Sequence, residues 1–231
     1  MRTVVLDSGY VELVETWGSD ERIIEAARMS TNKGFQGWGT PESQGDEKLL
    51  RFLWENKHAT PFEMAGMTIE VKAPIMVFRE WHRHRTQSYN EMSARYVPLP
   101  DENYTPTVAR ILSGARTDGA NKQSQGKAEI TEGDALEWLA SLADVYQHAQ
   151  HVYERGISIG VPKELARLTV PVARYSRMRA SANLRNWLGF LSLRMPSNAQ
   201  WEIRQYANTV GEVVKVAFPR TWALFSEGRP A

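Results

Sequence analysis

The sequence contains no cysteine among its 231 residues. A disulfide framework, a thiolate zinc site and a cysteine nucleophile are therefore excluded. A strong charge of either sign is also missing, because 28 Lys and Arg residues offset 27 Asp and Glu residues and leave a net charge of +1. Since there is no global positive field to attract nucleic acid, we expect no nucleic-acid partner, and any basic binding site has to be local.

Long hydrophobic runs are absent as well. No apolar segment approaches the ~20 residues that a membrane-spanning helix needs, so we expect no membrane partner. The first residues, MRTVVLDSGYVELVE, carry acidic groups early and lack the apolar centre of a signal peptide. These features predict a cytoplasmic location. The chain also lacks the glycine fingerprint of a Rossmann or P-loop site, so a bound dinucleotide needs a different fold.

The apolar content is sufficient for a sizeable core. Hydrophobic residues make up 42% of the chain and aromatic residues 10%, which is typical of a globular protein. The length allows one domain or at most two small ones. We predict a single domain over residues 1–231, with a polar surface excursion at about 113–134, because neither side of that segment looks complete alone.

Hydrophobic periodicity predicts an α+β fold, in which helices pack around a small, twisted, largely antiparallel sheet. The predicted strands are residues 3–6, 10–15, 67–71 and 174–181. The predicted helices are residues 21–29 (capped by Ser19 or Asp20), 46–57, 75–85, 135–156, a segment from 162, 183–193 and 199–218. Residues 32–45 are predicted to be a loop, and the chain is expected to be irregular from Pro219. In the helix at 135–156 the residues expected to face inward are Leu136, Leu139, Leu142, Val145 and Tyr146.

Residues 83–95, RHRTQSYNEMSAR, are the densest group of potential ligand contacts. They follow the apolar run 73–78, so a buried element is expected to deliver polar groups into a cleft. Two guanidinium groups beside an imidazole suit phosphate or a planar anion. Such a stretch also fits a solvated face with local ion pairs. A second basic group comprises Arg174, Arg177, Arg179, Arg185 and Arg194, and these residues either meet an anionic ligand or pair with acids such as Glu164 and Glu202.

The histidines and Ser93 raise the alternatives of a metal site and a serine nucleophile. His82 and His84 are two residues apart, which on a helix places them on different faces. No carboxylate cluster completes a site around them, so we expect no bound metal. Ser93 lacks the GxSxG elbow of a nucleophilic serine, and its hydroxyl equally suits phosphate binding.

Several segments together resemble the flavin-dependent thymidylate synthases over nearly the whole chain. They are AARMS at 26–30, HATPFE at 58–63, the RHR…NEMSAR stretch, ELARLTVP at 164–171, and NLRNWLGFLSLR to NAQWEIRQYA at 183–207. The resemblance implies the reductive methylation of dUMP to dTMP, with methylenetetrahydrofolate as carbon donor and FAD reduced by NADPH as hydride source. It also implies a homotetramer with active sites shared between subunits. The absence of cysteine agrees, because the cysteine-dependent thymidylate synthases attack the pyrimidine with a thiolate.

The resemblance also assigns roles to residues of this sequence. The implied FAD contacts are Thr60, Arg83, His84, Arg85, Glu91, Asn183, Leu184, Arg185 and Gly189. The implied dUMP contacts are Glu80, Trp81, His82, Arg83, Glu91, Met92, Ser93, Ala94, Arg95, Arg167 and Arg194. Among these, Ser93, Ala94, Arg95 and Arg167 would hold the phosphate. Arg194 would face the uracil ring as the catalytic residue, and His58 and His84 would lie near the flavin and folate rings.

Two positions depart from the family pattern. Glu80 stands where many relatives have Gln, and a carboxylate beside an anionic substrate needs a cationic partner. Gly189 stands where some relatives have Asn, and it offers only backbone. Two other functions stay open: a flavoprotein with a different reductase activity, and a non-enzymatic protein that binds RNA or nucleotides. The second lacks the expected net basic charge and stacking repeats.

Overall fold

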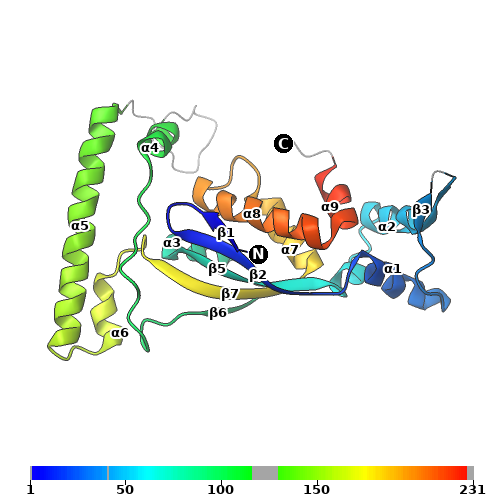
Figure 1. Ribbon diagram of the computed structural model, residues 1–231, viewed down its shortest axis with the longest axis horizontal. Coiled ribbons are helices and arrows are strands. Elements are labelled where there is room, and N and C mark those ends of the chain that lie inside the picture. The colour runs from blue at the N-terminus through cyan, green and yellow to red at the C-terminus, as the bar shows by residue number, and fades with distance from the viewer. Residues whose placement is uncertain (1, 41, 116–129, 228–231) are drawn as a thin grey trace.

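A five-stranded antiparallel sheet runs through the centre of the computed structural model, which describes residues 2–40, 42–115 and 130–227 (Figure 1). The strand order is β1–β2–β5–β7–β6, and β3 and β4 form a separate short hairpin. The strands are β1 (Arg2–Val5), β2 (Gly9–Trp17), β3 (Trp38–Thr40), β4 (Ser43–Gln44), β5 (Gly66–Pro74), β6 (Ser88–Glu91) and β7 (Tyr175–Asn183). The predicted α+β fold with an antiparallel sheet is confirmed.

Helices account for most of the remaining described residues. The α-helices are α1 (Asp20–Arg28), α2 (Gly45–Glu55), α3 (Ile75–Trp81), α4 (Val108–Ala115), α5 (Glu132–Ser158), α6 (Lys163–Ala166), α7 (Leu184–Arg194), α8 (Trp201–Ala217) and α9 (Pro219–Ser226). The short 3-10 turns are η1 (Met29–Thr31), η2 (Thr60–Glu63) and η3 (Arg167–Thr169). The predicted polar excursion at 113–134 lies largely outside the described residues, and its last residues begin α5.

The main core lies between the sheet and the helices α7 and α8, which cover one face of the sheet (Figure 1). On β5, Met67, Ile69 and Val71 are fully buried, as the alternation of apolar and polar residues predicts. Trp187 of α7 and Tyr206 of α8 pack against them without exposure to solvent. This core fixes the ends of β7 and α7, from which several candidate site residues project.

The Ser19 cap predicted for the first helix is confirmed, and a second cap, at Asn183, was not predicted. Ser19 caps α1, and its hydroxyl accepts a hydrogen bond from the Arg22 amide. α7 begins directly where β7 ends, and the Asn183 side chain accepts from the Asn186 amide at 2.9 Å. Such caps satisfy amides that have no partner in the first turn of a helix. The tight connection at Asn183 fixes the direction in which α7 leaves the sheet.

Two predictions of irregular structure are wrong. The expected loop at 32–45 contains the β3–β4 hairpin, in which Trp38 donates to the Glu21 carboxylate at 2.7 Å. The expected irregular end from Pro219 is the helix α9, held by Thr221 and the Arg220 amide, which both donate to the buried Asp20 carboxylate. In both cases the stabilising partner is distant in the sequence, so a local pattern does not reveal it.

Helix α5 stands at one end of the molecule, away from the sheet (Figure 1). Its capping box is complete, because Thr131 and Asp134 exchange hydrogen bonds. The predicted inward face is wrong in part, since Leu136 and Val145 are 54% and 58% exposed. Only Ala135 and Tyr153 of this helix are buried. No helix within the described ranges, α5 included, is long and apolar enough to cross a bilayer.

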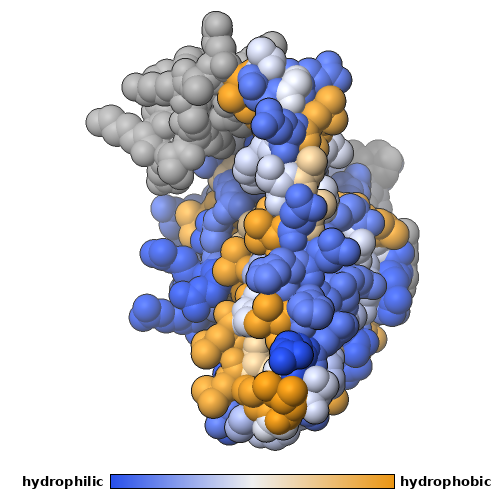
Figure 2. Space-filling model, turned by 90° about the vertical axis from the view of Figure 1, so that its left-hand side faces the viewer, coloured by the Kyte–Doolittle hydropathy of each residue, from blue (hydrophilic) through white to orange (hydrophobic). Residues whose placement is uncertain are grey.

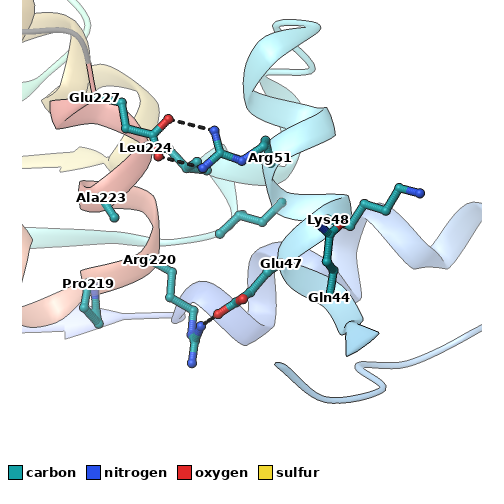
Figure 3. Close-up of a pocket in the computed structure, with 10 residues that line it drawn as sticks. Gln44, Glu47, Lys48, Arg51, Pro219, Arg220, Ala223, Leu224 and Glu227 are labelled. Atoms are coloured by element: carbon teal, nitrogen blue, oxygen red, sulfur yellow. Dashed lines mark hydrogen bonds and ion pairs between the residues drawn. The ribbon is translucent and has the colours of Figure 1, made fainter. Parts of the chain in front are cut away.

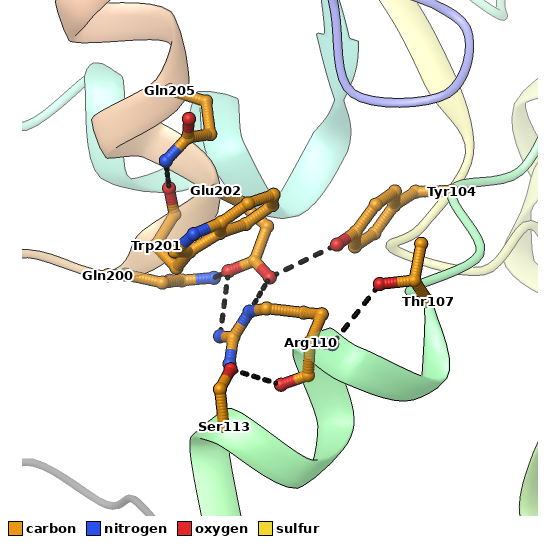
Figure 4. A network of polar contacts seen from close by, with 8 residues as sticks. All are labelled: Tyr104, Thr107, Arg110, Ser113, Gln200, Trp201, Glu202 and Gln205. Carbon is orange, nitrogen blue, oxygen red and sulfur yellow. Dashed lines mark hydrogen bonds and ion pairs between the residues drawn. The ribbon is translucent and has the colours of Figure 1, made fainter.

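A buried polar network ties α4 to the first turn of α8 (Figure 4). Glu202 is 4% exposed and accepts from Arg110 at 2.8 Å, Gln200 at 2.9 Å and the Tyr104 hydroxyl at 3.2 Å. Burial alone raises the pKa of Glu202, but the Arg110 and Gln200 hydrogen bonds bring it below the ordinary value. Glu202 therefore stays ionised and acts as a structural anchor, as expected of an acid that pairs with an arginine.

Candidate active site

The stretch at 83–95 forms a turn followed by an edge strand. α3 ends at Trp81, not at Arg85 as predicted, and the His84 amide donates to the Trp81 carbonyl in a tighter turn. The Tyr89 hydroxyl donates to the His84 carbonyl at 2.6 Å, which holds the turn against β6. β6 then pairs with β7. The helical spacing assumed for His82 and His84 therefore does not apply.

Arg194, the last residue of α7, is fixed by two side chains from the α3 end. One of its terminal nitrogens donates to the Glu80 carboxylate at 2.9 Å, and the other to the Glu80 carbonyl at 3.3 Å. Its Nε donates to His84 Nε2 at 2.9 Å. The Arg194 side chain is only 18% exposed. A guanidinium has five N–H donors, so this arrangement orients Arg194 and leaves donors for a ligand. It also supplies the cationic partner that Glu80 needs.

His84 is neutral in this arrangement. Arg194 has no acceptor, so His84 Nε2 accepts and the proton lies on Nδ1. Burial, and then the positive charge of Arg194, lower the pKa of His84 from 6.5 to about 4. The ring also packs edge-on against Phe190 at 4.9 Å between centroids. The imidazole is therefore an uncharged group that is available to donate from Nδ1.

The low pKa of His84 predicts a pH-dependent stability. Between about pH 6.5 and pH 4 the unfolded chain binds a proton at this residue and the folded chain does not. The free energy of unfolding therefore falls as pH decreases through that window. We expect His84→Gln to lose less stability than the wild type between pH 7 and pH 5 in urea unfolding. The exposed His148→Gln serves as a control, and equal pH dependence in His84→Gln and wild type contradicts the assignment.

Two of the predicted ligand contacts belong to the core. Trp81 is fully buried, donates to Gln87 at 3.0 Å and stacks on Phe190 with centroids 4.5 Å apart. Leu184 is also fully buried. The side chains of these two predicted ligand contacts therefore serve packing. His82, by contrast, is exposed, with its Nε2 3.1 Å from the Met178 sulfur.

A cavity of about 340 Å³ brings together most of the predicted phosphate-binding residues. It is lined by Ile75, Glu91, Met92, Ser93, Ala94, Leu99, Arg167, Val170 and Ser176, and we call it the Ser93 cavity. Arg95 and Arg167 converge on Glu164: Arg95 is 3.2 Å from its carboxylate, and Arg167 donates to its carbonyl at 3.3 Å. The Ser93 hydroxyl accepts from the Arg95 amide at 3.3 Å. The site thus offers hydroxyl and guanidinium donors of the kind that bind phosphate.

A second cavity, of about 550 Å³, lies between α2 and α7. Its lining residues are Leu53, Trp54, Glu55, Lys57, His58, Ala59, Phe62, Arg185, Leu188, Gly189 and Ser192. Arg185 is paired with Glu63. An adjoining cavity of about 350 Å³ is lined in part by His58 and Thr60. Thr60 opens the turn η2, whose cap is Ala59. Of the predicted cofactor and folate residues, His58, Thr60, Arg185 and Gly189 therefore lie around these two cavities.

The arginines divide into ligand candidates and structural residues. Arg83 and Arg85 are exposed, and their side chains make no hydrogen bond or ion pair with any described residue. In the second basic group, Arg179 pairs with Glu70, and Arg174 is buried among polar partners. Pairing with acids thus holds for most of the second group, but the partners are Asp101, Glu70, Glu63 and Glu80 and not the predicted Glu164 and Glu202. Arg83 and Arg85 leave their charges for a ligand.

A third cavity, also of about 550 Å³, was not predicted from the sequence. It lies between α2 and α9 (Figure 3). Arg51 pairs with Glu227, and Arg220 pairs with Glu47. Because these charges neutralise one another, the cavity has little demand for an ionic ligand, and we do not place the active site there.

The two candidate cavities share no lining residue within one chain. Arg194 lines neither of them, although Glu80 and His84 connect it to the motif that reaches Ser93. Within the described residues of one chain, the predicted site residues therefore form three groups and not a single cleft. One group lies at the Ser93 cavity, one at the cavity between α2 and α7, and one at Arg194 with Glu80 and His84.

Comparison with known proteins gives a consistent result. Residues 12–220 match the family described as thymidylate synthase complementing protein. The flavin-dependent thymidylate synthase of Thermus thermophilus is 40% identical over 96% of this chain and 77% of its own length. That of Thermosipho melanesiensis is 39% identical over 97% of this chain and 93% of its own. The crystal structure of the UMP/dUMP methylase PolB from Streptomyces cacaoi, bound with 5-Br dUMP, has a TM-score of 0.81 and 31% identity, and each chain covers 97% of the other.

The fold and these matches define an enzyme of the nucleotide-methylating, flavin-using class. The chain belongs to the family of flavin-dependent thymidylate synthases. The family predicted from the sequence motifs is therefore confirmed.

Proposed function

We propose that this protein methylates dUMP reductively to dTMP, with methylenetetrahydrofolate as the one-carbon donor and NADPH-reduced FAD as the hydride source. The observation that carries the proposal is the Ser93 cavity, which gathers Glu91, Met92, Ser93, Ala94 and Arg167. These residues come from two distant segments that the resemblance marks as dUMP contacts, with Ser93, Ala94 and Arg167 expected at the phosphate. The 5-Br dUMP bound by PolB supports a pyrimidine nucleotide as the ligand.

The residues that would hold FAD have the character its pyrophosphate requires. Arg83 and Arg85 are exposed and unpaired among the described residues, and two guanidinium groups suit a diphosphate. At Gly189 an added Cβ would meet no atom within 4 Å, so this position leaves open space in the cavity that Arg185 and His58 also line. Bound FAD supplies hydride chemistry that no side chain provides. Asn183 and Thr60 are proposed as polar contacts at the same end of α7.

Arg194 is proposed to activate the uracil ring. The C5 atom becomes nucleophilic when negative charge develops on the N3–C4–O4 side of the ring. Since the chain has no cysteine to add at C6, this charge has to be stabilised electrostatically. An arginine held by Glu80 and His84 is preorganised for that task, as donors are in an oxyanion hole. Neutral His84 adds a donor at Nδ1 without a second positive charge, and His58 is proposed to lie near the folate.

The direct test is the release of tritium from [5-³H]dUMP. We expect release that depends on methylenetetrahydrofolate, NADPH and FAD together, and a yellow purified protein with a flavin absorption spectrum. A flavoprotein that oxidises NADPH without releasing tritium would indicate a different reductase activity. Nucleotide binding without a flavin would indicate a non-enzymatic binding protein.

We further propose that the protein is a homotetramer with active sites completed between subunits, and that it is cytoplasmic. The α5 end of the molecule exposes many large apolar side chains (Figure 2). They include Leu136, Trp138, Val145, Ile159, Leu165, Leu168 and Val172, which are between 50% and 80% exposed. Apolar surface of this kind marks protein interfaces. Because Leu168 adjoins Arg167, a subunit docked here would lie beside the Ser93 cavity.

Light scattering tests the oligomer. We expect a mass of four times the 26.3 kDa chain. Val145→Glu should reduce the mass and the activity together, because it puts a charge into the apolar face of α5. The neighbouring, polar and exposed Gln147→Glu adds the same charge and should leave both unchanged. A wild type that is monomeric and active at assay concentration contradicts the proposal.

Ser93 is expected to bind and not to attack. Its hydroxyl accepts from the Arg95 amide, and no described histidine or carboxylate hydrogen-bonds to it as a base. Nucleophilic serines need such a base. Ser93→Ala should therefore weaken dUMP binding, measured calorimetrically, yet retain measurable turnover. Complete loss of turnover in the variant, with a nucleotide covalently trapped on wild-type Ser93, would overturn this expectation.

A further inference from the structure

Ser176 of β7 has a buried hydroxyl without a partner. The residue is 2% exposed, and its Oγ has no hydrogen-bond partner among the described residues. Buried hydroxyls are nearly always satisfied, because leaving one unpaired is unfavourable. Ser176 is one of four described residues with such an atom, and of these it alone lines the Ser93 cavity.

The strand fixes this hydroxyl in place. Ser176 pairs with Ala73 of β5 within a continuous antiparallel ladder, so the backbone has little freedom to move the side chain toward another partner. Alternate residues of a strand share a face, and the next three on this face are Met178, Ala180 and Ala182, all buried. Ser176 is the polar exception on an otherwise apolar face, and it occurs where that face meets the cavity.

The other groups around the cavity indicate what the hydroxyl meets. Ser93 and Arg167 line the same cavity, and both are donors. Arg167 brings a positive charge, which favours an anionic oxygen as the common acceptor. A hydroxyl that is unpaired in the protein alone is completed when such an oxygen enters.

We infer that Ser176 is an additional substrate-binding residue that donates its hydroxyl proton to a phosphate oxygen of the nucleotide. This inference rests on the proposed function, since it takes dUMP as the occupant of the Ser93 cavity. No residue motif of the sequence marked Ser176 for this role.

The test compares Ser176→Ala with wild type in dUMP and deoxyuridine binding by calorimetry and in thermal melting without ligand. We expect dUMP to bind about tenfold more weakly or worse to the variant, because a hydrogen bond to a charged acceptor is lost. Deoxyuridine, which lacks the phosphate, should bind both proteins equally. The melting temperature should stay at the wild-type value or rise, because the substitution removes an unpaired buried hydroxyl.

Ser181→Ala is the matched control. Ser181 lies on the same strand, but its hydroxyl is already bonded to that of Thr68 at 3.0 Å, so the variant should leave dUMP binding unchanged. Unaltered dUMP binding by Ser176→Ala, an equal loss for dUMP and deoxyuridine, or a clear drop in its melting temperature would each overturn the inference. If wild type itself does not bind dUMP, the proposed function fails first, so the two failures are distinguishable.

Discussion

Arg194→Ala is expected to lower the rate of the methylation step strongly, while the reduction of the flavin that precedes it stays intact. The guanidinium is held at 2.9 Å from both the Glu80 carboxylate and His84 Nε2, so it is oriented before a substrate arrives. Removing a preorganised donor of this kind costs ~100-fold or more in rate. We expect the variant to fold, to bind FAD and to be reduced by NADPH, because Arg194 ends α7 and is not part of the main core.

The measurement is a single-turnover trace of flavin reoxidation under anaerobic conditions, with dUMP and methylenetetrahydrofolate added to reduced enzyme. Arg194→Lys should fall between wild type and Arg194→Ala, because it retains a charge but loses the planar fork. Arg22→Ala, at a side chain that is 67% exposed on α1, controls for the loss of an arginine. If Arg194 only favours the helix dipole, the effect is ~0.3–1 kcal/mol on stability. A wild-type reoxidation rate in Arg194→Ala would contradict the catalytic assignment.

The sequence predicted correctly those helices and strands that are specified by residues close together in the chain. The alternation in β5 and the Ser19 cap of α1 each depend on residues close in the sequence. α9 and the β3–β4 hairpin depend on Asp20 and Glu21, which lie far from them along the chain. The inward face assigned to α5 was wrong in part for a related reason. Periodicity shows that a helix has an apolar face but does not show whether that face meets this chain or another.

In the candidate site too, the residues of a contiguous motif were predicted, and contacts between distant segments were not. The contiguous motif at 83–95 marked its own residues, and Ser93 and Arg167 share a cavity as the resemblance implied. The contacts of Arg194 with Glu80 and His84 join segments 110 or more residues apart, so the sequence did not reveal them. Ser176 was missed because an ordinary serine in a strand carries no motif. The lack of a hydrogen-bond partner for its hydroxyl among the described residues depends on the three-dimensional structure.

Arg174 shows most clearly how charge in a sequence is ambiguous. It stood with Arg179 in one basic group, five positions apart on the same segment. In the structure Arg174 is 1% exposed, whereas the Arg179 side chain is 62% exposed beside Glu70. The Arg174 guanidinium donates to the Pro100 carbonyl and to Gln150 at 2.8 Å each. It therefore joins β7 to the loop after the Ser93 motif and to α5.

This difference predicts a large loss of stability for Arg174→Ala. The substitution leaves partly buried acceptors without a donor, including the Pro100 carbonyl and the Gln150 and Asn103 side-chain oxygens. Each unsatisfied group costs ~1–3 kcal/mol, so we expect the free energy of unfolding to fall by about 3 kcal/mol or more. Arg179→Ala removes an exposed pair and should cost less than about 1 kcal/mol. Urea unfolding at one fixed protein concentration compares the two, because oligomerisation makes stability depend on concentration. Equal losses in the two variants would mean that Arg174 is not the structural tie between β7 and α5, and would return it to the candidates for ligand binding.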